Sequence, residues 1–226
     1  MRSKSDVVSR LLDPGIIAVV RAQKAEQVLP LSEALIAGGV SAIEITMTTP
    51  NAIGTIRETS RSIGARGVIG AGTVLEARTC SEVIEAGAEF VVSPILRPEI
   101  AATCRGFDRP AMLGAYTPTE AQLAHEAGAD FIKIFPSDGL GPNYIRAIRA
   151  PLPHLRIIPT GIASRDDVAG FIRAGCVAVG LGSLLITRPI LDAADWPELT
   201  RRAREFVAVV RQARAERPDE WQAVRQ

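Results

Sequence analysis

The sequence predicts an α/β protein, a single-domain (β/α)8 barrel of the TIM type, from two observations. Short apolar runs return roughly every 20 to 26 residues along the 226-residue chain, and the segments between them have the periodicity of amphipathic helices. Strands that alternate with helices form a parallel sheet with right-handed crossovers. Eight such units in about 200 residues, without a break in composition, favour a closed barrel. An open doubly wound sheet is the alternative, because periodicity does not prove closure.

The apolar runs and the helical segments can be placed along the chain. Helices are predicted over Ala25–Ala37, Ala77–Ala86, Pro118–Ala127 and Arg165–Ala174, and each ends before a glycine suited to a left-handed cap. The barrel domain, with a short helix in roughly its first dozen residues, is predicted over 1–214, and the charged segment 215–226 as a peripheral tail. The predicted strands are Ile16–Val20, Ala42–Thr46, Val68–Gly70, Phe90–Val92, Ala111–Leu113, Phe131–Phe135, Arg156–Pro159 and Val177–Gly180.

Composition and charge exclude several classes of protein. With 47% hydrophobic residues the chain can bury a large core, and 26 basic residues interspersed with 25 acidic ones do not indicate a nucleic-acid partner. No apolar stretch is long enough to span a bilayer, and the N-terminus lacks the apolar core of a signal peptide. Three scattered cysteines and two histidines without ligand spacing lead us to expect a cytoplasmic protein with no metal and no cofactor.

One lysine stands out in a chain that otherwise uses arginine. The sequence has 23 arginines and 3 lysines, and Lys133 lies in the middle of the apolar run Phe131–Phe135. A lysine amine, unlike a guanidinium, can lose its proton near neutral pH and attack a carbonyl carbon. The alternative is a structural lysine that pairs with a buried carboxylate. This segment alone does not decide between the two.

Strand alternation predicts which side chains face the barrel interior. Lys133 is flanked by two isoleucines that suit the helix-covered outer face, so we expect Lys133 to point inward. Glu44 is flanked by isoleucines in the same way and is also expected inside. Both lie toward the C-terminal ends of their strands, where barrel enzymes carry catalytic groups. A buried ion pair is again the alternative.

Other polar and glycine-rich positions follow the predicted strands at the same rim. Arg21 closes the first strand, Thr73 follows the third, Ser93 and Pro94 end the fourth, and Thr117 follows the fifth. Each of them alone is typical of an ordinary turn, but several such positions at one rim of the barrel indicate a substrate-binding or catalytic site.

The loops after the last two strands carry glycines and a serine. Gly161 follows the seventh strand, and Gly182 and Ser183 follow the eighth. Barrels commonly bind phosphate there through backbone N–H groups. These loops therefore favour a phosphorylated substrate, with tight turns as the alternative.

Taken together and in order, these motifs resemble the 2-keto-3-deoxy-6-phosphogluconate (KDPG) aldolase family, which includes the phosphogalactonate and 4-hydroxy-2-oxoglutarate aldolases. The resemblance runs from about Gly15 to Val210. It implies a (β/α)8 barrel, usually a homotrimer, that cleaves a 2-keto-3-deoxy sugar acid phosphate to pyruvate and D-glyceraldehyde 3-phosphate without a metal. The segments that carry it are Ala18–Arg21, Gly38–Val40, Ile43–Thr46, Gly70–Val74, Ser93–Pro94, Thr117–Glu120, Lys133–Pro136, Pro159–Gly161 and Gly182–Ser183.

The same resemblance implies the roles of the site residues. Lys133 would form a Schiff base with the 2-keto carbon, and Glu44 would relay protons through a water. The substrate-binding residues that it implies are Arg21 and Thr73 near the pyruvyl carboxylate, Ser93 and Pro94, and Gly161, Gly182 and Ser183 around the phosphate.

The chain departs from the family pattern at three positions. Ile162 replaces a glycine of the phosphate loop, and a β-branched residue does not readily take a positive φ, so we expect a reshaped or weakened loop. Leu113 stands where a proline is common, and Thr48 where some members have arginine, which leaves Arg21 as the clearer carboxylate partner.

Two other functions fit the same residues. A phosphosugar isomerase or epimerase on this barrel would use Glu44 as a base and Lys133 as an electrostatic partner, and would form no adduct with pyruvate. A catalytically silent barrel, kept for binding or assembly, would not need the inward Lys133 and Glu44.

Overall fold

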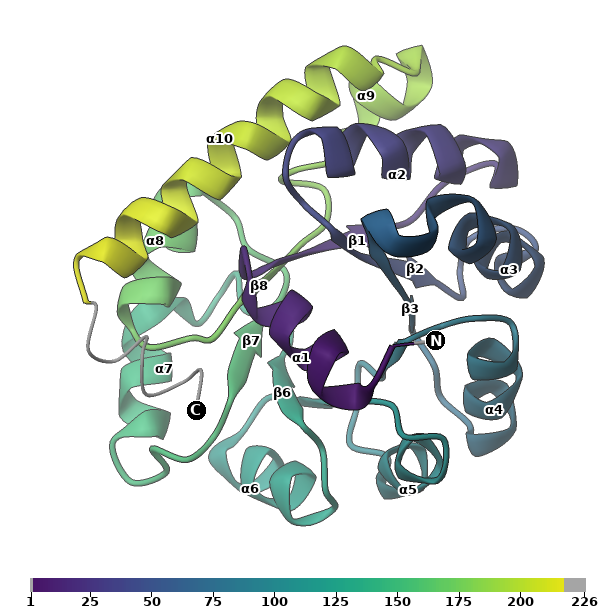
Figure 1. The fold of residues 1–226 in the computed structure, drawn as a ribbon. Helices are drawn as coiled ribbons and strands as arrows, with labels where there is room; N and C mark the ends of the chain where they lie inside the picture. The colour runs from purple at the N-terminus through teal and green to yellow at the C-terminus, as the bar shows by residue number, and fades with distance from the viewer. Residues whose placement is uncertain (1, 218–226) are drawn as a thin grey trace.

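The computed structural model describes residues 2–217 as a barrel of eight parallel strands surrounded by helices (Figure 1). The strands pair in the order β7-β6-β5-β4-β3-β2-β1-β8. A parallel bridge between Thr160 and Gly180 joins the two ends of this order, β7 and β8. A nearly closed barrel is therefore found, as predicted, and not an open sheet. The strands are β1 (Ile16–Val20), β2 (Ala42–Thr46), β3 (Val68–Gly72), β4 (Phe90–Val92), β5 (Ala111–Ala115), β6 (Phe131–Ile134), β7 (Ile157–Pro159) and β8 (Val179–Leu181).

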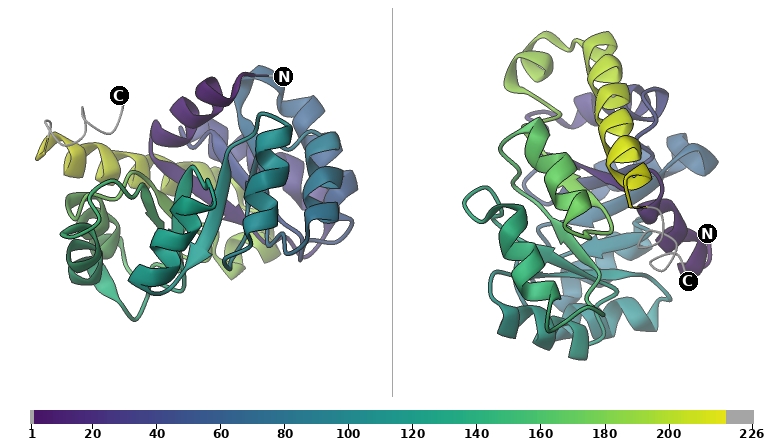
Figure 2. Two further views of the ribbon diagram at one scale, coloured as in Figure 1. Left: turned by 90° about the horizontal axis from the view of Figure 1, so that it is seen from below. Right: turned by 90° about the vertical axis from the view of Figure 1, so that its left-hand side faces the viewer.

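Helices connect successive strands and cover the outside of the barrel (Figure 2). Some of their starts carry side-chain caps: Thr117 accepts a hydrogen bond from the N–H of Glu120, and Ser164 from that of Asp167. Within residues 2–217 no helix is both long and apolar enough to cross a membrane. The helices are α1 (Lys4–Leu12), η1 (Ala25–Gln27), α2 (Val28–Ala37), α3 (Ala52–Ile63), η2 (Gly64–Arg66), α4 (Ala77–Glu85), α5 (Pro98–Gly106), α6 (Pro118–Glu126), α7 (Gly141–Arg149), α8 (Arg165–Arg173), α9 (Arg188–Ala193) and α10 (Trp196–Ala215).

Strand bounds differ from the prediction mainly where small residues continue a strand. β3 runs on to Gly72 and β5 to Ala115. Backbone pairing does not require a large apolar side chain, and Gly72 pairs in register with Thr46 of β2. At the C-terminal end, α10 continues to Ala215, one residue beyond the predicted domain limit. Positions 218–226 of the predicted tail lie outside the described residues.

Alternate side chains of each strand fall into two apolar layers. Ile132 and Ile134 belong to the outer layer, between the strands and the helices. Phe131 belongs to a separate inner cluster that fills the barrel. Lys133 has the same parity as Phe131, so its predicted inward orientation is confirmed.

The first helix closes the N-terminal end of the barrel. Val7, Leu11 and Leu12 of α1 belong to the inner cluster, and α1 lies across the barrel in Figure 1. Lys4 Nζ also forms an ion pair with Asp130 at 2.8 Å. With this end filled by α1, the C-terminal ends of the strands are where polar groups gather.

Candidate active site

Lys133 and Glu44 face each other inside the barrel. Lys133 is on β6 and Glu44 on β2, and Lys133 Nζ lies 3.6 Å from Glu44 Oε1. Their side chains are 4% and 2% exposed, so bulk water does not surround the pair. Glu44 Oε1 has no hydrogen bond to any described residue, and 3.6 Å is too long for a direct N–H···O bond. The pair therefore lacks the direct hydrogen bond typical of a structural salt bridge.

Two glycines make space beside this pair, one on the strand next to Glu44 and one on the strand next to Lys133. A Cβ added at Gly72 would lie 1.9 Å from Glu44 Oε1, so the carboxylate rests against bare backbone. Gly114 is in register with Lys133, and a Cβ there would lie 2.1 Å from the carbonyl carbon of Pro94. The loop after β4 thus folds over β5 next to the lysine. Close approach of this kind requires glycine.

The structure places the predicted residues Thr73, Ser93 and Pro94 at the ends of β3 and β4. Thr73 has a φ of 60°, a left-handed conformation that is uncommon for a β-branched residue. Strain of this kind gathers at functional sites, which keeps Thr73 a candidate for binding. Ser93 is fully buried, and its Oγ accepts a hydrogen bond from the N–H of Ile95 at 3.4 Å.

A cleft of about 480 Å³ lies at the ends of β1, β7 and β8. Phe135, which follows β6, forms part of its wall, and Lys133 Nζ lies 5.4 Å from the centre of that ring. The cleft therefore adjoins the lysine. Four of the residues expected to bind substrate line it, namely Arg21, Gly161, Gly182 and Ser183.

The loops that line this cleft carry backbone donors without acceptors. The N–H groups of Ile162, Ser183 and Leu184 donate to no other residue of the described chain. The Arg21 guanidinium likewise forms no ion pair within residues 2–217, and it lines the same cleft. Free N–H groups suit an anion such as a phosphate, and the guanidinium adds a positive charge to the same cleft.

The backbone strain at Ile162, on which the expectation of a reshaped or weakened loop was based, is not found. The positive φ in this loop, 78°, falls on Gly161, and Ile162 is not among the residues with positive φ. A β-branched side chain is therefore tolerated at 162. The Ile162 side chain is buried in the outer layer and also contributes to the cleft wall.

Ser137, which the sequence analysis did not assign to the site, ties two of these loops together. Its Oγ donates to the carbonyl oxygen of Thr160 at 2.9 Å and lies 3.2 Å from that of Gly161. Its N–H also donates to the Thr160 carbonyl at 3.0 Å. Ser137 thereby fixes the loop after β7 against the loop after β6. Serine in a Pro-Ser turn carries no distinctive sequence signal for such a contact.

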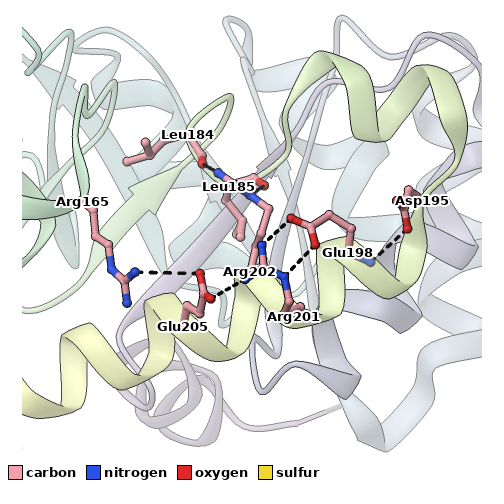
Figure 3. Close-up of polar contacts among 8 residues, drawn as sticks. All are labelled: Arg165, Leu184, Leu185, Asp195, Glu198, Arg201, Arg202 and Glu205. Carbon is pink, nitrogen blue, oxygen red and sulfur yellow. Dashed lines mark hydrogen bonds and ion pairs between the residues drawn. The ribbon is translucent and has the colours of Figure 1, made fainter.

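Arg202 of α10 holds the turn after β8 from behind and was also missed. Its guanidinium donates to the carbonyl oxygens of Leu184 at 2.6 Å and Leu185 at 3.2 Å (Figure 3). The adjacent Arg201 pairs instead with Glu198 and Glu205 on the helix surface. The Arg202 side chain turns toward the barrel, whereas that of Arg201 stays on the solvent-facing side of the helix.

The chemistry of the site rests on an amine and a carboxylate. Across the described part of the chain, no three His, Cys, Asp or Glu side chains lie together as metal ligands. A buried amine can act as a nucleophile, and a carboxylate beside it can move protons. The adjoining cleft can hold an anionic group. Fold and site together define a barrel enzyme with a lysine and a carboxylate at the C-terminal ends of its strands.

Comparison with known proteins identifies the family. The family model described as KDPG and KHG aldolase matches residues 7–202, and the chain belongs to this family. Its relatives include 2-dehydro-3-deoxy-phosphogluconate aldolase of Pseudomonas aeruginosa, at 32% identity over 84% of this chain and 86% of that protein. Another is 2-dehydro-3-deoxy-6-phosphogalactonate aldolase of Escherichia coli, at 34% identity over 88% and 95%.

A solved structure of a relative bears on the chemistry. KDPG aldolase from Legionella pneumophila was captured with pyruvate as a covalent carbinolamine intermediate. It shares 27% sequence identity with this chain, covers 88% of it and 96% of its own length, and has a TM-score of 0.80. The barrel described above is thus shared with an aldolase that forms a covalent pyruvate intermediate.

Proposed function

We propose that the protein is a class I aldolase that cleaves 2-keto-3-deoxy-6-phosphogluconate, or its galactonate epimer, to pyruvate and D-glyceraldehyde 3-phosphate. The observation that carries this proposal is the buried Lys133–Glu44 pair, 3.6 Å apart. Membership of the KDPG and KHG aldolase family supports it. The reaction needs no metal, because a protonated imine withdraws electrons from the bond that breaks.

The first step joins the substrate to the enzyme. The unprotonated Lys133 amine attacks the C2 ketone carbon and forms a carbinolamine, which loses water to give a protonated imine. Glu44 lies beside the amine and can supply the proton that turns the carbinolamine hydroxyl into water. The distance of 3.6 Å between the two groups suits a relay through one water molecule.

The second step breaks the bond between C3 and C4. Glu44 takes the proton of the C4 hydroxyl, the C3–C4 electron pair moves into the imine as an enamine, and the aldehyde leaves. The enamine then takes a proton at C3, and hydrolysis of the imine releases pyruvate and restores the Lys133 amine. One carboxylate thus serves as base and then as acid, which requires it to keep its position between the two steps.

The other predicted residues bind the two ends of the substrate in this proposal. Thr73, Ser93 and Pro94, at the ends of β3 and β4, surround the pyruvyl end, and Arg21 supplies the positive charge for its carboxylate. The cleft supports a phosphate site at the far end, because N–H groups of its loops lack acceptors in the described structure. Gly161, Gly182 and Ser183 hold the phosphate there.

The alternatives have less support. An isomerase or epimerase would need a second acid or base besides Glu44, and neither a carboxylate nor a histidine is among the described residues that line the cleft. A catalytically silent barrel would not account for the buried charges of Lys133 and Glu44, which are costly without a role. The aldolase relatives favour the first function.

The finer expectations about the protein's setting are part of the proposal. We infer a homotrimer in the cytoplasm that acts in carbohydrate metabolism, on the strength of the family resemblance. Three free and buried cysteines are consistent with a reducing compartment. The mass of the native assembly, measured by light scattering, tests the trimer.

The experiment that tests the activity is a trapping reaction. The protein is incubated with pyruvate and borohydride, and its intact mass is measured beside that of Lys133→Ala. A stable pyruvyl adduct on the parent and none on the variant is the expected result. No adduct on the parent would overturn the aldolase proposal and return Lys133 to the role of a structural partner of Glu44.

A further inference from the structure

The cleft beside the lysine carries a second guanidinium that the reaction scheme above does not use. Arg188, the first residue of α9, lines the cleft together with Arg21, Gly182 and Ser183. Arg21 and Arg188 are the arginines among its described lining residues. Arg188 carries no distinctive sequence signal, because a Thr-Arg-Pro segment is typical of an ordinary helix start.

The orientation of Arg188 is set by a small polar network. Its Nε lies 2.9 Å from Oδ1 and 3.0 Å from Oδ2 of Asp192, one turn later on α9. Asp192 also accepts a hydrogen bond from Gln23 Nε2 at 3.1 Å, and Gln23 is another residue of the cleft wall. Gln27 donates to the Leu191 carbonyl at 2.9 Å and ties α9 to the segment after β1.

Most of the donors of Arg188 are still available. A guanidinium has five N–H donors, and the contacts with Asp192 use Nε alone. Neither terminal nitrogen forms a hydrogen bond with another residue of the described chain. The side chain is 70% exposed at the cleft, so those nitrogens can reach a ligand that enters it.

The charge of the substrate gives these donors a role. A 2-keto-3-deoxy sugar acid phosphate carries a carboxylate at one end and a dianionic phosphate at the other. Arg21 binds the carboxylate in the proposed scheme, so without Arg188 the phosphate would be bound by neutral N–H groups alone. A guanidinium edge with two N–H groups matches two phosphate oxygens.

We propose that Arg188 is a specificity-determining residue that binds the distal phosphate of the substrate, and that Asp192 and Gln23 orient it. This inference rests on the proposed function for the identity of the substrate. It makes the preference for a phosphorylated substrate depend on a side chain from α9, in addition to the backbone of the loops after β7 and β8.

A matched control separates this role from that of an ordinary surface ion pair. Arg78 of α4 forms the same kind of pair, with its Nε 2.9 Å from Glu82 Oε1, four residues later on its helix. Its side chain is 86% exposed, and it is not among the residues that line the cleft. Arg188→Met and Arg78→Met therefore remove equivalent helix pairs, of which the first alone faces the cleft.

The test uses calorimetric binding of 3-phosphoglycerate and of glycerate, which carry no ketone and cannot react with Lys133. We expect Arg188→Met to weaken binding of 3-phosphoglycerate about tenfold or more, since a charge-assisted contact is lost. Glycerate, which lacks the phosphate, should show no comparable loss. Arg78→Met should bind both ligands as the parent does.

Several results would overturn the inference. They are no binding of 3-phosphoglycerate to the parent, a loss below twofold in Arg188→Met, or an equal loss for glycerate, which would indicate a structural effect. The borohydride experiment on the parent reports on the aldolase chemistry separately. If the parent forms the pyruvyl adduct and Arg188→Met binds 3-phosphoglycerate as the parent does, the proposed aldolase function stands and Arg188 has no part in phosphate binding.

Discussion

Lys133 and Glu44 come from β6 and β2, and their charged atoms are 3.6 Å apart in the barrel interior. A direct hydrogen bond would need a shorter distance, and Glu44 Oε1 forms none with the described residues. A purely structural buried pair normally offsets its desolvation cost with such bonds. The arrangement instead keeps the amine and the carboxylate close to each other without locking them together, which suits groups that change partners during a reaction.

The first prediction concerns the carboxylate. Glu44→Gln keeps the shape of the side chain but removes its proton-relay capacity, so we expect turnover of the phosphorylated substrate to fall about 10²- to 10⁴-fold. Steady-state kinetics of pyruvate release measure the loss.

Glu89→Gln is the matched control for Glu44→Gln. Glu89 is another buried carboxylate in an ion pair, with Arg2 at 2.5 Å, but it lies next to the pocket formed around Gly64 and Gly87. We expect it to lower the melting temperature without a comparable loss of turnover. Equal kinetic losses in both variants would mean that the effect of Glu44→Gln is one of stability.

The second prediction tests the position of the carboxylate without removing it. Gly72→Ala would place a methyl group 1.9 Å from Glu44 Oε1, so the carboxylate must move. A shift of about 1 Å in a reacting group can cost about 100-fold in rate. We expect a loss of that order in kcat, measured by the same assay.

Gly106→Ala serves as the control for the glycine substitution. A Cβ at Gly106, in α5, would meet nothing within 4 Å. Alanine at this position reduces the conformational freedom of the unfolded chain. We therefore expect Gly106→Ala to leave kcat unchanged and to raise the free energy of unfolding by about 0.5 kcal/mol. Normal activity in Gly72→Ala would show that the position of Glu44 does not limit the reaction.

The third prediction concerns the turn after β8. Arg202→Met removes the donors to the carbonyl oxygens of Leu184 and Leu185 (Figure 3). We expect an increase in KM for the phosphorylated substrate that exceeds any change in kcat, because the turn contributes to the phosphate end of the cleft. Lost hydrogen bonds of about 1–2 kcal/mol should lower the melting temperature by roughly 2–8 °C.

The neighbouring arginine provides the comparison for Arg202. Arg201→Met removes exposed pairs with Glu198 and Glu205 on the same helix. Surface pairs of this kind contribute little, so both KM and the melting temperature should stay near the parent values. If Arg202→Met lowers stability but leaves KM unchanged, the turn does not depend on this arginine for ligand binding.

The fourth prediction concerns the cysteines. Cys80, Cys104 and Cys176 are free and buried, and Cys80 and Cys104 have their sulfur atoms 3.5 Å apart. The hydrogen bond with Cys80, together with burial, raises the pKa of Cys104, and burial raises the pKa of Cys176. Cys104 and Cys176 are therefore present as thiols at pH 8. The hydrogen bond with Cys104 lowers the pKa of Cys80, but this side chain is fully buried and shielded from reagents.

A thiol titration measures this directly. We expect an aromatic disulfide reagent to label the native protein slowly at pH 8, and three thiols to react at once in denaturant. Rapid labelling of a thiol in the native protein would contradict the buried positions of these side chains. The rate in the native state should rise as denaturant is added, in step with unfolding.

The sequence by itself determined the parts of this protein that depend on local repeats. Alternation of side chains along a strand has a period of two residues, so the inward orientation of Lys133 and Glu44 could be predicted without any contact. Helix starts at Thr117 and Ser164 could also be predicted, because a capping side chain bonds to backbone only a few residues away. Strand ends could not be predicted to the residue, because small residues such as Gly72 continue a strand without an apolar signal.

Only the tertiary structure decided how these local features meet. Closure at Thr160 and Gly180, the separation of Lys133 from Glu44, and the position of Arg188 at the cleft depend on how strands and helices far apart in the chain pack together. The backbone conformation at Ile162 also depends on its loop, where Gly161 takes the positive φ. Local periodicity places a side chain on a face, but distances between faces are set by barrel closure and packing.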